Sequence, residues 1–446
     1  MSPTFAALNN FNYRLWAMGA IVSNTGTWMQ RVAQDWLVLT VLTTNSGVAV
    51  GITTGLQFAP MLLLAPFAGL LADRLPKRRL LMATQASSGL WALILGLLVV
   101  TQTADLWHVY VLAGLLGISS AVDAPARQTF VAEMVDRNQL SNAVSLNSAS
   151  FHAARMIGPA LAGVLIAAIG TGPVFLLNAI TFGATLFALT QMRARELRPL
   201  PRALRSKGQI REGIRYVRRR PDLILIMTIV GVVGTFGLNF QLTTALMARL
   251  EFDKGATAYG LLGSIMAIGS LAGALIAARR ERPRLRLIVG AAGAFGVFAI
   301  VASLMPTYEL FAISLIPIGL SSLTMMTAAN ATVQMTTDPE MRGRVMSLYM
   351  AIFMGGTPVG APVIGWVGET FGAPWTIAIG GIAALAVAVA AVAVVSRTRH
   401  LSVSYRLSQR PHLLVQTALR DDESSAREDA RRQLAAEQAR DTASAA

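Results

Sequence analysis

One acidic residue, Asp35, lies within a long apolar segment of this 446-residue chain, and Arg31 precedes it by four positions. That spacing places both side chains on one face of a helix, where they can pair. A carboxyl group in apolar surroundings favours its neutral form, whereas a nearby guanidinium group favours the charged form. We therefore expect Asp35 and Arg31 to form a site that responds to protons or other cations. The alternative is a static pair that only holds the segment against its neighbours.

A second pair of polar side chains, His152 and Arg155, lies near the middle of another apolar segment. An arginine at that depth must face a cavity or a partner, because exposure to lipid is costly. We expect Arg155 to bind an anionic part of a ligand or to repel the proton from an acidic neighbour. Structural roles are the alternative for both residues. The cavity is expected to include three amide side chains, Asn24, Gln57 and Asn239.

The elements that carry these residues are predicted to be membrane-spanning helices. The chain is 54% hydrophobic and only 14% charged, whereas soluble proteins contain about 25% charged residues. A helix needs about 20 apolar residues to cross the hydrocarbon core. Only helices and closed barrels satisfy their backbone in lipid, and short alternating segments are absent. We predict an all-α membrane protein with twelve spans, near 14–41, 47–71, 80–101, 107–126, 142–169, 173–191, 223–247, 258–278, 285–305, 309–333, 345–367 and 373–395.

Basic residues gather in alternate loops and so predict the orientation. The loops on one side include the runs 74–79, 193–220 and 279–286, whereas the loops on the other side contain only Arg249 and Lys254. Because positive residues favour the cytoplasm, we expect the basic loops and both termini to be cytoplasmic, in a multi-pass protein of the bacterial inner membrane. The net charge of +15 is spread over these loops, so it does not predict a nucleic-acid partner.

A basic segment divides the chain into two sets of six spans. We expect an N-terminal domain over 1–191, a cytoplasmic linker over 192–222, a C-terminal domain over 223–396 and a disordered cytoplasmic tail over 397–446. Ile210–Tyr216 in the linker could form a short amphipathic helix on the membrane surface. A basic loop that only fixes the topology is the interpretation that we favour for this segment.

The two sets of spans show weak internal similarity. A shift of 202 residues places Asp136 on Asp338, Gly158 on Gly360 and Gly163 on Gly365. These residues begin or fill spans five and eleven, which hold the same position in each half. The two halves are therefore expected to be structural repeats.

Three short motifs connect the chain to a known family. Residues 69–79 read Gly-Leu-Leu-Ala-Asp-Arg-Leu-Pro-Lys-Arg-Arg. This segment resembles the G-x-x-x-D-R-x-G-R-K signature of the major facilitator superfamily, with Pro76 in place of the usual Gly. Residues 155–163 resemble the Gly-Pro motif of its drug:proton antiporter branch, without the upstream glycines. Residues 338–348, with 125–128, resemble an exporter subgroup that includes multidrug and macrolide pumps and the enterobactin exporter.

The resemblance implies two six-helix pseudo-repeat domains that rock around a central cavity. It also implies a latch between Asp73, Asp123 and Arg344 that holds the halves together when the cavity opens outward. Further gating residues implied in this way are Gly69, Arg74, Arg78 and Arg342, and those of the antiporter motif are Gly158, Pro159 and Gly163. Charges that only set the topology are the alternative interpretation of the latch.

These observations predict a secondary active transporter that exports amphiphilic small molecules by alternating access, in exchange for protons. The alternatives are a dedicated siderophore exporter, a lipid flippase and, more remotely, a receptor or scaffold. The sequence contains no phosphate-binding Gly-Lys-Ser/Thr loop, no cysteine and only four scattered histidines. We therefore expect no enzyme activity, cofactor or metal site. The expected partners are the substrate, protons and membrane lipids, and we expect a monomer.

Overall fold

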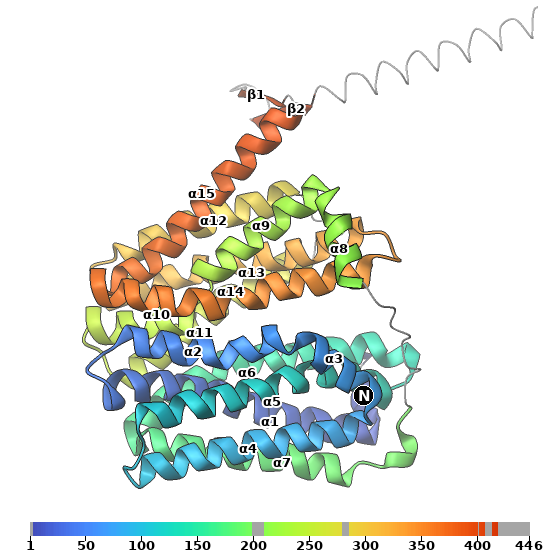
Figure 1. The fold of residues 1–446 in the computed structure, drawn as a ribbon, viewed down its shortest axis with the longest axis vertical. Helices are drawn as coiled ribbons and strands as arrows, with labels where there is room; N and C mark the ends of the chain where they lie inside the picture. The colour runs from blue at the N-terminus through green and yellow to red at the C-terminus, as the bar shows by residue number, and fades with distance from the viewer. Residues whose placement is uncertain (1–2, 199–208, 279–284, 400, 406–412, 418–446) are drawn as a thin grey trace, which may run out of the picture. The chain divides into compact units, whose positions relative to one another are not determined.

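The computed structural model describes residues 3–198, 209–278, 285–399, 401–405 and 413–417, and these residues are almost entirely helical (Figure 1). The chain divides into two units, residues 1–385 and residues 386–446. The first unit contains every helix up to the first part of α15 (Ala373–Arg399). The second contains the rest of α15 and a pair of short strands. The all-α membrane fold predicted from the sequence is confirmed.

The N-terminal half, residues 3–198, contains the first six spans. Its elements are η1 (Pro3–Asn9), α1 (Phe11–Leu37), the π-helical turn η2 (Val38–Leu42), α2 (Gly47–Leu63), α3 (Ala65–Arg74), α4 (Lys77–Val100), α5 (Leu106–Met134), η3 (Arg137–Gln139), α6 (Leu140–Ile169), α7 (Thr171–Gln191) and η4 (Ala194–Glu196). Within this half α1 packs against α6 and α7, while α5 packs against α2 and α4.

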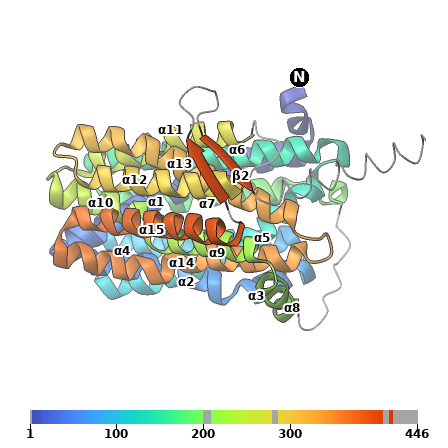
Figure 2. The same cartoon turned by 90° about the horizontal axis from the view of Figure 1, so that it is seen from above.

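The C-terminal half, residues 209–385 of the first unit, repeats this arrangement. Its elements are α8 (Gln209–Arg218), α9 (Pro221–Phe236), α10 (Phe240–Leu246), the π-helical turn η5 (Met247–Glu251), α11 (Ala256–Ala278), α12 (Leu285–Ser303), α13 (Tyr308–Thr336), α14 (Arg342–Phe371) and the start of α15. Helix α13 packs against α11 and α12, and α14 packs against α9. Most helices run lengthwise and side by side in both views of the bundle (Figures 1 and 2).

Ten of the twelve predicted spans correspond to helical segments of the described chain that are long and apolar enough to cross a membrane. The other two are α1 and α2. Helix α2 is short because the second span breaks at Leu64, and α3 follows with a proline in its first turn. Helix α1 is long enough to cross a membrane, but it is too polar to be recognised as a span by its composition. It includes buried Asn12, Gln30, Gln34 and Asp35. Its position against α6 and α7 removes the need for a fully apolar exterior.

The seventh span is interrupted in the middle. Helix α9 ends at Phe236 and α10 begins at Phe240, while the side chain of Asn239 donates a hydrogen bond to the Thr235 carbonyl oxygen at 2.7 Å. Irregular backbone at membrane depth occurs where it is buried in protein or lines a cavity. This break therefore marks a stretch of chain that is suited to a binding site.

The two halves meet along two seams of closely packed small residues. At the α2–α14 seam, a Cβ atom on Gly51 would lie 2.4 Å from the Ala361 carbonyl oxygen. At the α6–α11 seam, a Cβ atom on Gly260 would lie 2.2 Å from the Pro159 carbonyl oxygen. Such short distances leave room only for glycine, which allows helix backbones to touch.

The internal repeat is visible in the contacts of its matched glycines. Gly158 packs against the first span at Trp28, and its match Gly360 packs against the seventh span at Thr235. Gly163 meets the start of α11, and Gly365 meets the start of α2. Each matched glycine therefore contacts the equivalent helix of the bundle.

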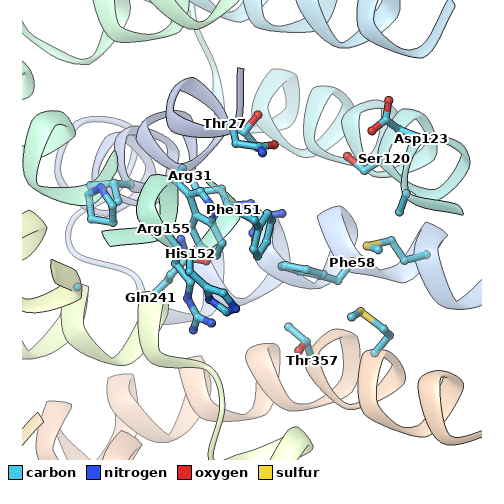
Figure 3. Close-up of a pocket in the computed structure, with 18 of the residues that line it drawn as sticks. Thr27, Arg31, Phe58, Ser120, Asp123, Phe151, His152, Arg155, Gln241 and Thr357 are labelled. Atoms are coloured by element: carbon cyan, nitrogen blue, oxygen red, sulfur yellow. The ribbon is translucent and has the colours of Figure 1, made fainter. Parts of the chain in front are cut away.

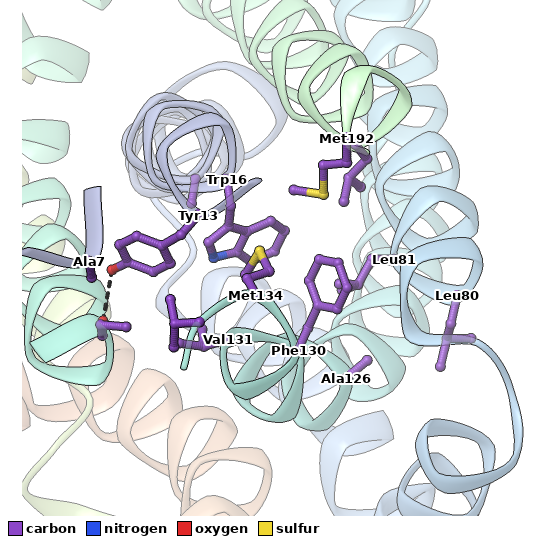
Figure 4. Close-up of a cluster of buried hydrophobic side chains, with 14 of the residues drawn as sticks. Ala7, Tyr13, Trp16, Leu80, Leu81, Ala126, Phe130, Val131, Met134 and Met192 are labelled. Atoms are coloured by element: carbon purple, nitrogen blue, oxygen red, sulfur yellow. Dashed lines mark hydrogen bonds between the residues drawn. The ribbon is translucent and has the colours of Figure 1, made fainter. Parts of the chain in front are cut away.

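A cluster of buried apolar side chains stabilises one end of the N-terminal half (Figure 4). Trp16 lies edge-on to Phe130 with ring centroids 5.6 Å apart, and Met134 and Leu81 pack in the same cluster. The Tyr13 hydroxyl donates to the Ala143 carbonyl oxygen at 2.8 Å, so its polar group is satisfied within the apolar cluster. We call this end, where α3 ends and α4 begins among Arg and Lys residues, the basic end. The opposite end, where residues 43–46 join α1 to α2, is the distal end.

The linker and tail are only partly described. The linker includes the helix α8 at the position where we favoured a simple basic loop over an amphipathic helix, and residues 199–208 lie outside the described chain. Arg220 hydrogen-bonds Asp222, which raises the pKa of Arg220 above its ordinary value. In the tail, β1 (Leu401–Tyr405) pairs antiparallel with β2 (Leu413–Thr417). Residues 418–446 lie outside the described chain, so the expected disorder of the tail stays a prediction.

Candidate functional site

A cavity of about 850 Å³ lies between the two halves. Its walls come from α1, α2, α4, α5, α6 and α7 on one side, and from the broken seventh span, α11 and α14 on the other. The aromatic residues Trp28, Phe58, Phe151 and Phe240 supply much of the apolar wall. The cavity extends toward the basic end, because Gln128 in the last turns of α5 also lines it.

Two arginines lie close to one aromatic ring inside this cavity. The guanidinium carbon of Arg31 lies 4.7 Å from the Trp28 ring centroid, and that of Arg155 lies 5.4 Å from the same ring. Arg31 also lies 5.1 Å from the Phe58 ring. Figure 3 shows Arg31, Arg155 and His152 gathered on one side of the cavity, away from Asp123. Arg155 is therefore one of the residues that line the cavity.

Asp35 lies deeper than the cavity wall. Its side chain is buried, and its Oδ2 atom accepts a hydrogen bond from the Tyr259 hydroxyl at 3.2 Å. Tyr259 lines the cavity and stacks on Trp36 with ring centroids 5.8 Å apart. Because Asp35 belongs to α1 and Tyr259 to α11, this hydrogen bond joins the two halves.

The expected ion pair between Arg31 and Asp35 does not form among the described residues. Their spacing does place them on one helix, but Arg31 turns toward aromatic rings while Asp35 turns toward Tyr259. Stacking on two rings offers the guanidinium group a cation–π contact. The hydroxyl of Tyr259 offers the carboxyl group a partner that i,i+4 geometry on one helix does not predict.

The expected latch residues are held separately in this conformation. Asp123 accepts hydrogen bonds from Thr84, Gln85 and Arg127, each at 2.8 Å, and all four residues belong to the N-terminal half. Arg344 pairs with Glu212 of α8 at 2.7 Å, within the C-terminal half. The side chain of Asp73 lies outside the described part of the structure.

The other gating residues also lie within their own half. Arg78 donates to the carbonyl oxygens of Leu189 and Thr190 at the end of α7. Arg74 and Arg342 are exposed, and Gly69 lies in α3. These positions place the group at the basic end without joining the halves.

The cross-half hydrogen bonds described in the structure lie at the distal end and toward the middle of the bundle. The Glu369 carboxylate on α14 accepts from the Ser46 hydroxyl at 3.0 Å and from the Val48 backbone N–H at 3.1 Å. Ser46 caps α2, so Glu369 lies at the N-terminus of that helix. Ser264 donates to the Met156 carbonyl oxygen at 2.6 Å across the α6–α11 seam. The structure is therefore sealed toward the distal end, with the cavity extending toward the basic end.

The remaining predicted residues divide into two groups. Asn24, His152, Asn239 and Pro159 line the cavity, whereas Gln57 is buried and does not. The motif glycines Gly158 and Gly163 serve helix packing. Sequence reasoning missed the roles of Tyr259 and Glu369, since each finds its partner far along the chain. Within the described residues, no group of acidic or histidine side chains has the arrangement of a metal site.

Comparisons with known proteins agree with this geometry. The Staphyloferrin A transporter of Staphylococcus aureus (strain NCTC 8325 / PS 47) is 26% identical over 370 residues, which cover 81% of this chain and 91% of that protein. The multidrug efflux pump Tap of Mycolicibacterium fortuitum is 26% identical over 364 residues, covering 79% of this chain and 88% of the pump.

A solved structure supports the fold alone. The bacterial homologue of the human lysosomal transporter Spinster, in an inward-facing and unoccupied conformation, has a TM-score of 0.65 at 13% identity, and the match covers 88% of this chain and 96% of that one. The family model of the transmembrane secretion effectors matches residues 2–424. The protein therefore belongs to the transmembrane secretion effector family of the major facilitator superfamily and is a secondary active exporter.

Proposed function

We propose that inward proton flow drives this exporter, and that it takes amphiphilic small molecules from the cytoplasm or the inner leaflet by alternating access. The basic loops support a cytoplasmic basic end in the bacterial inner membrane. The cavity extends toward this basic end, and the seal lies at the distal end. The conformation described here is then the one that loads substrate.

The observation that carries this proposal is the position of Asp35. It is an acidic side chain buried in a membrane span, and its hydrogen-bond partner belongs to the other half of the bundle. Buried ionisable groups in membrane proteins commonly mark proton pathways. Protonation removes the negative charge that the Tyr259 hydroxyl faces, and thereby weakens a contact between the halves. Proton binding and rocking are coupled through this pair.

Asp35→Asn tests the proposal because it keeps the shape of the side chain and removes its titration. Wild-type and variant proteins would be compared in energised inverted vesicles, with ethidium and naphthalene-2-sulfonate as probes and with or without a protonophore. We expect wild-type accumulation of naphthalene-2-sulfonate that collapses with the protonophore, and Asp35→Asn protein that folds but takes up this probe roughly a hundredfold more slowly, the low end of the contribution of a positioned acid–base group.

Glu309→Gln is the matched control, because Glu309 is an exposed carboxyl group at the start of α13. Wild-type accumulation that is unchanged by the protonophore would refute proton coupling. Accumulation by Asp35→Asn equal to that of wild type would remove Asp35 from the proton path.

A dedicated siderophore exporter is the second candidate, and the two cavity arginines favour it. Siderophores carry carboxylate or catecholate groups, which guanidinium groups bind well. The two candidate functions differ in the range of substrates that they predict. A multidrug pump accumulates chemically unrelated probes, whereas a dedicated exporter accumulates one chelator class and neither of the two dyes.

A further inference from the structure

We infer that Trp28, Arg31 and Arg155 form a subsite for an anionic group carried on a flat apolar body, so that this exporter selects amphiphilic anions over amphiphilic cations. This inference names the substrate class and rests on the proposed function for the statement that the bound molecule is exported. Binding to the subsite can be measured without any proton gradient.

The first support is a set of donors without acceptors. Neither Arg31 nor Arg155 makes a hydrogen bond or an ion pair with any described residue, and the Nε atom of Arg31 is buried without a partner. The Gln241 Nε2 atom, on the wall of the same cavity, is also buried without a partner. Buried donors left unpaired destabilise the protein, because they lose their hydrogen bonds to water without replacement. A ligand that supplies acceptor atoms satisfies them.

The second support is the contrast with other cations of the described chain. Lys77 pairs with Glu133 at 2.6 Å, Arg127 with Asp123 at 2.8 Å, and Arg220 with Asp222 at 2.7 Å. Each of these side chains is at least partly buried and has a carboxylate of its own. Arg31 and Arg155 instead face a space of about 850 Å³. That space is large enough to hold an anionic ligand that would pair with them.

The third support is the shape of the surrounding wall. Both guanidinium groups lie against the Trp28 ring, and Phe151 packs edge-on against that ring with ring centroids 6.0 Å apart. Arg31 also lies against the Phe58 ring. Aromatic rings and guanidinium planes both stack on flat apolar groups. The wall therefore fits an aromatic body whose anionic substituent reaches the arginines.

The same geometry works against cations. The acidic group on the cavity wall, Asp123, already accepts hydrogen bonds from three side chains of its own half. A cationic ligand would meet two guanidinium groups that form no ion pair with a described residue, at low dielectric, where repulsion is strong. The arginines attract anions and repel cations, and both effects contribute to selection between ligands of matched size.

The test uses three naphthalenes of similar size that differ in charge: naphthalene-2-sulfonate, naphthalene-2-sulfonamide and 2-naphthyltrimethylammonium. Binding to the detergent-purified full chain is measured by isothermal titration calorimetry. We expect the sulfonate to bind at least about tenfold more tightly than the neutral sulfonamide, the factor expected for a hydrogen bond to a charged group. The ammonium probe should bind most weakly.

Arg155→Gln and Arg31→Gln should each remove about tenfold of the sulfonate affinity and leave sulfonamide binding nearly unchanged. Arg155→Lys keeps the charge and should retain part of the preference. Lys254→Gln is the matched control, because it removes an exposed cation that does not line the cavity. Thermal unfolding and gel filtration report whether each variant is folded.

Equal binding of all three naphthalenes to wild-type protein would overturn the inference. So would a sulfonate preference that survives in both arginine-to-glutamine variants. Sulfonate that binds selectively but is not accumulated by energised vesicles would support the subsite and count against the proposed export function. The two proposals therefore fail in different assays.

Discussion

At the scale of single residues, the chemistry of this exporter depends on groups that find their partners across the bundle. Asp35 draws notice in the sequence because a carboxyl group inside a membrane span is rare. Tyr259 gives no such signal, since a tyrosine near the start of a span is commonplace. Its hydroxyl reaches a residue 224 positions away in the chain. Helical spacing correctly put Arg31 and Asp35 on one helix, but it could not show that aromatic rings hold Arg31.

Tyr259→Phe should slow transport without unfolding the protein. The change removes the hydroxyl that donates to Asp35 and keeps the ring that stacks on Trp36. A hydrogen bond to a charged group contributes about 1.5–3 kcal/mol, so we expect a roughly tenfold or greater fall in protonophore-sensitive transport. Initial rates in proteoliposomes over a range of external pH would measure it.

Tyr308→Phe provides the control, because the Tyr308 hydroxyl donates to the Ala258 carbonyl oxygen within the C-terminal half. If Tyr259→Phe and Tyr308→Phe both transport at the wild-type rate at every pH, the Tyr259 hydroxyl has no part in coupling.

At the scale of helices, the sequence predicts the spans well and their interruptions less well. Long apolar runs define ten spans by composition alone. The breaks at Leu64 and at residues 237–239 depend on proline, glycine and tertiary contacts, which a hydropathy pattern does not separate from an intact helix. The same holds for the seams, where Gly51 and Gly260 touch the other half. A shift of 202 residues pairs the seam glycines Gly163 and Gly365 with each other. It does not predict which helix of the other half each glycine contacts.

The contact between Glu369 and the N-terminus of α2 should favour the conformation sealed at the distal end. Its carboxylate accepts two hydrogen bonds from the other half. An anion at an exposed helix N-terminus contributes about 0.3–1 kcal/mol. Glu369→Gln should therefore shift the population toward opening at that end by a factor of up to about five.

Spin labels on Val41→Cys and Phe371→Cys can report this shift as a change in their distance distribution. Both positions are exposed, and the chain contains no cysteine of its own, so labelling is confined to the chosen sites. Glu309→Gln serves as the control for lost charge in the C-terminal half. Identical distributions for wild type and Glu369→Gln would show that this contact does not bias the equilibrium.

At the scale of the whole molecule, two six-helix halves share a cavity whose two ends are controlled by different contacts. The distal end is held by Glu369, Tyr259 and the glycine seams. At the basic end, Asp123 and Arg344 are each occupied by partners of their own half. Alternating access requires these sets of contacts to exchange. For the latch implied by the family motif to form, Arg344 would have to leave Glu212.

A covalent bridge across the distal end should stop this exchange and leave substrate binding intact. Ser46→Cys and Glu369→Cys place one thiol on each half at positions whose side chains now touch. A cleavable bis-maleimide would join them in this cysteine-free chain. The bridged protein keeps its cavity open at the basic end, so it should bind naphthalene-2-sulfonate as the unbridged double variant does. Transport should disappear on bridging and return on cleavage, because rigid-body rocking needs the distal end to part. Transport that continues through an intact bridge would show that substrate leaves without the halves separating at this seam.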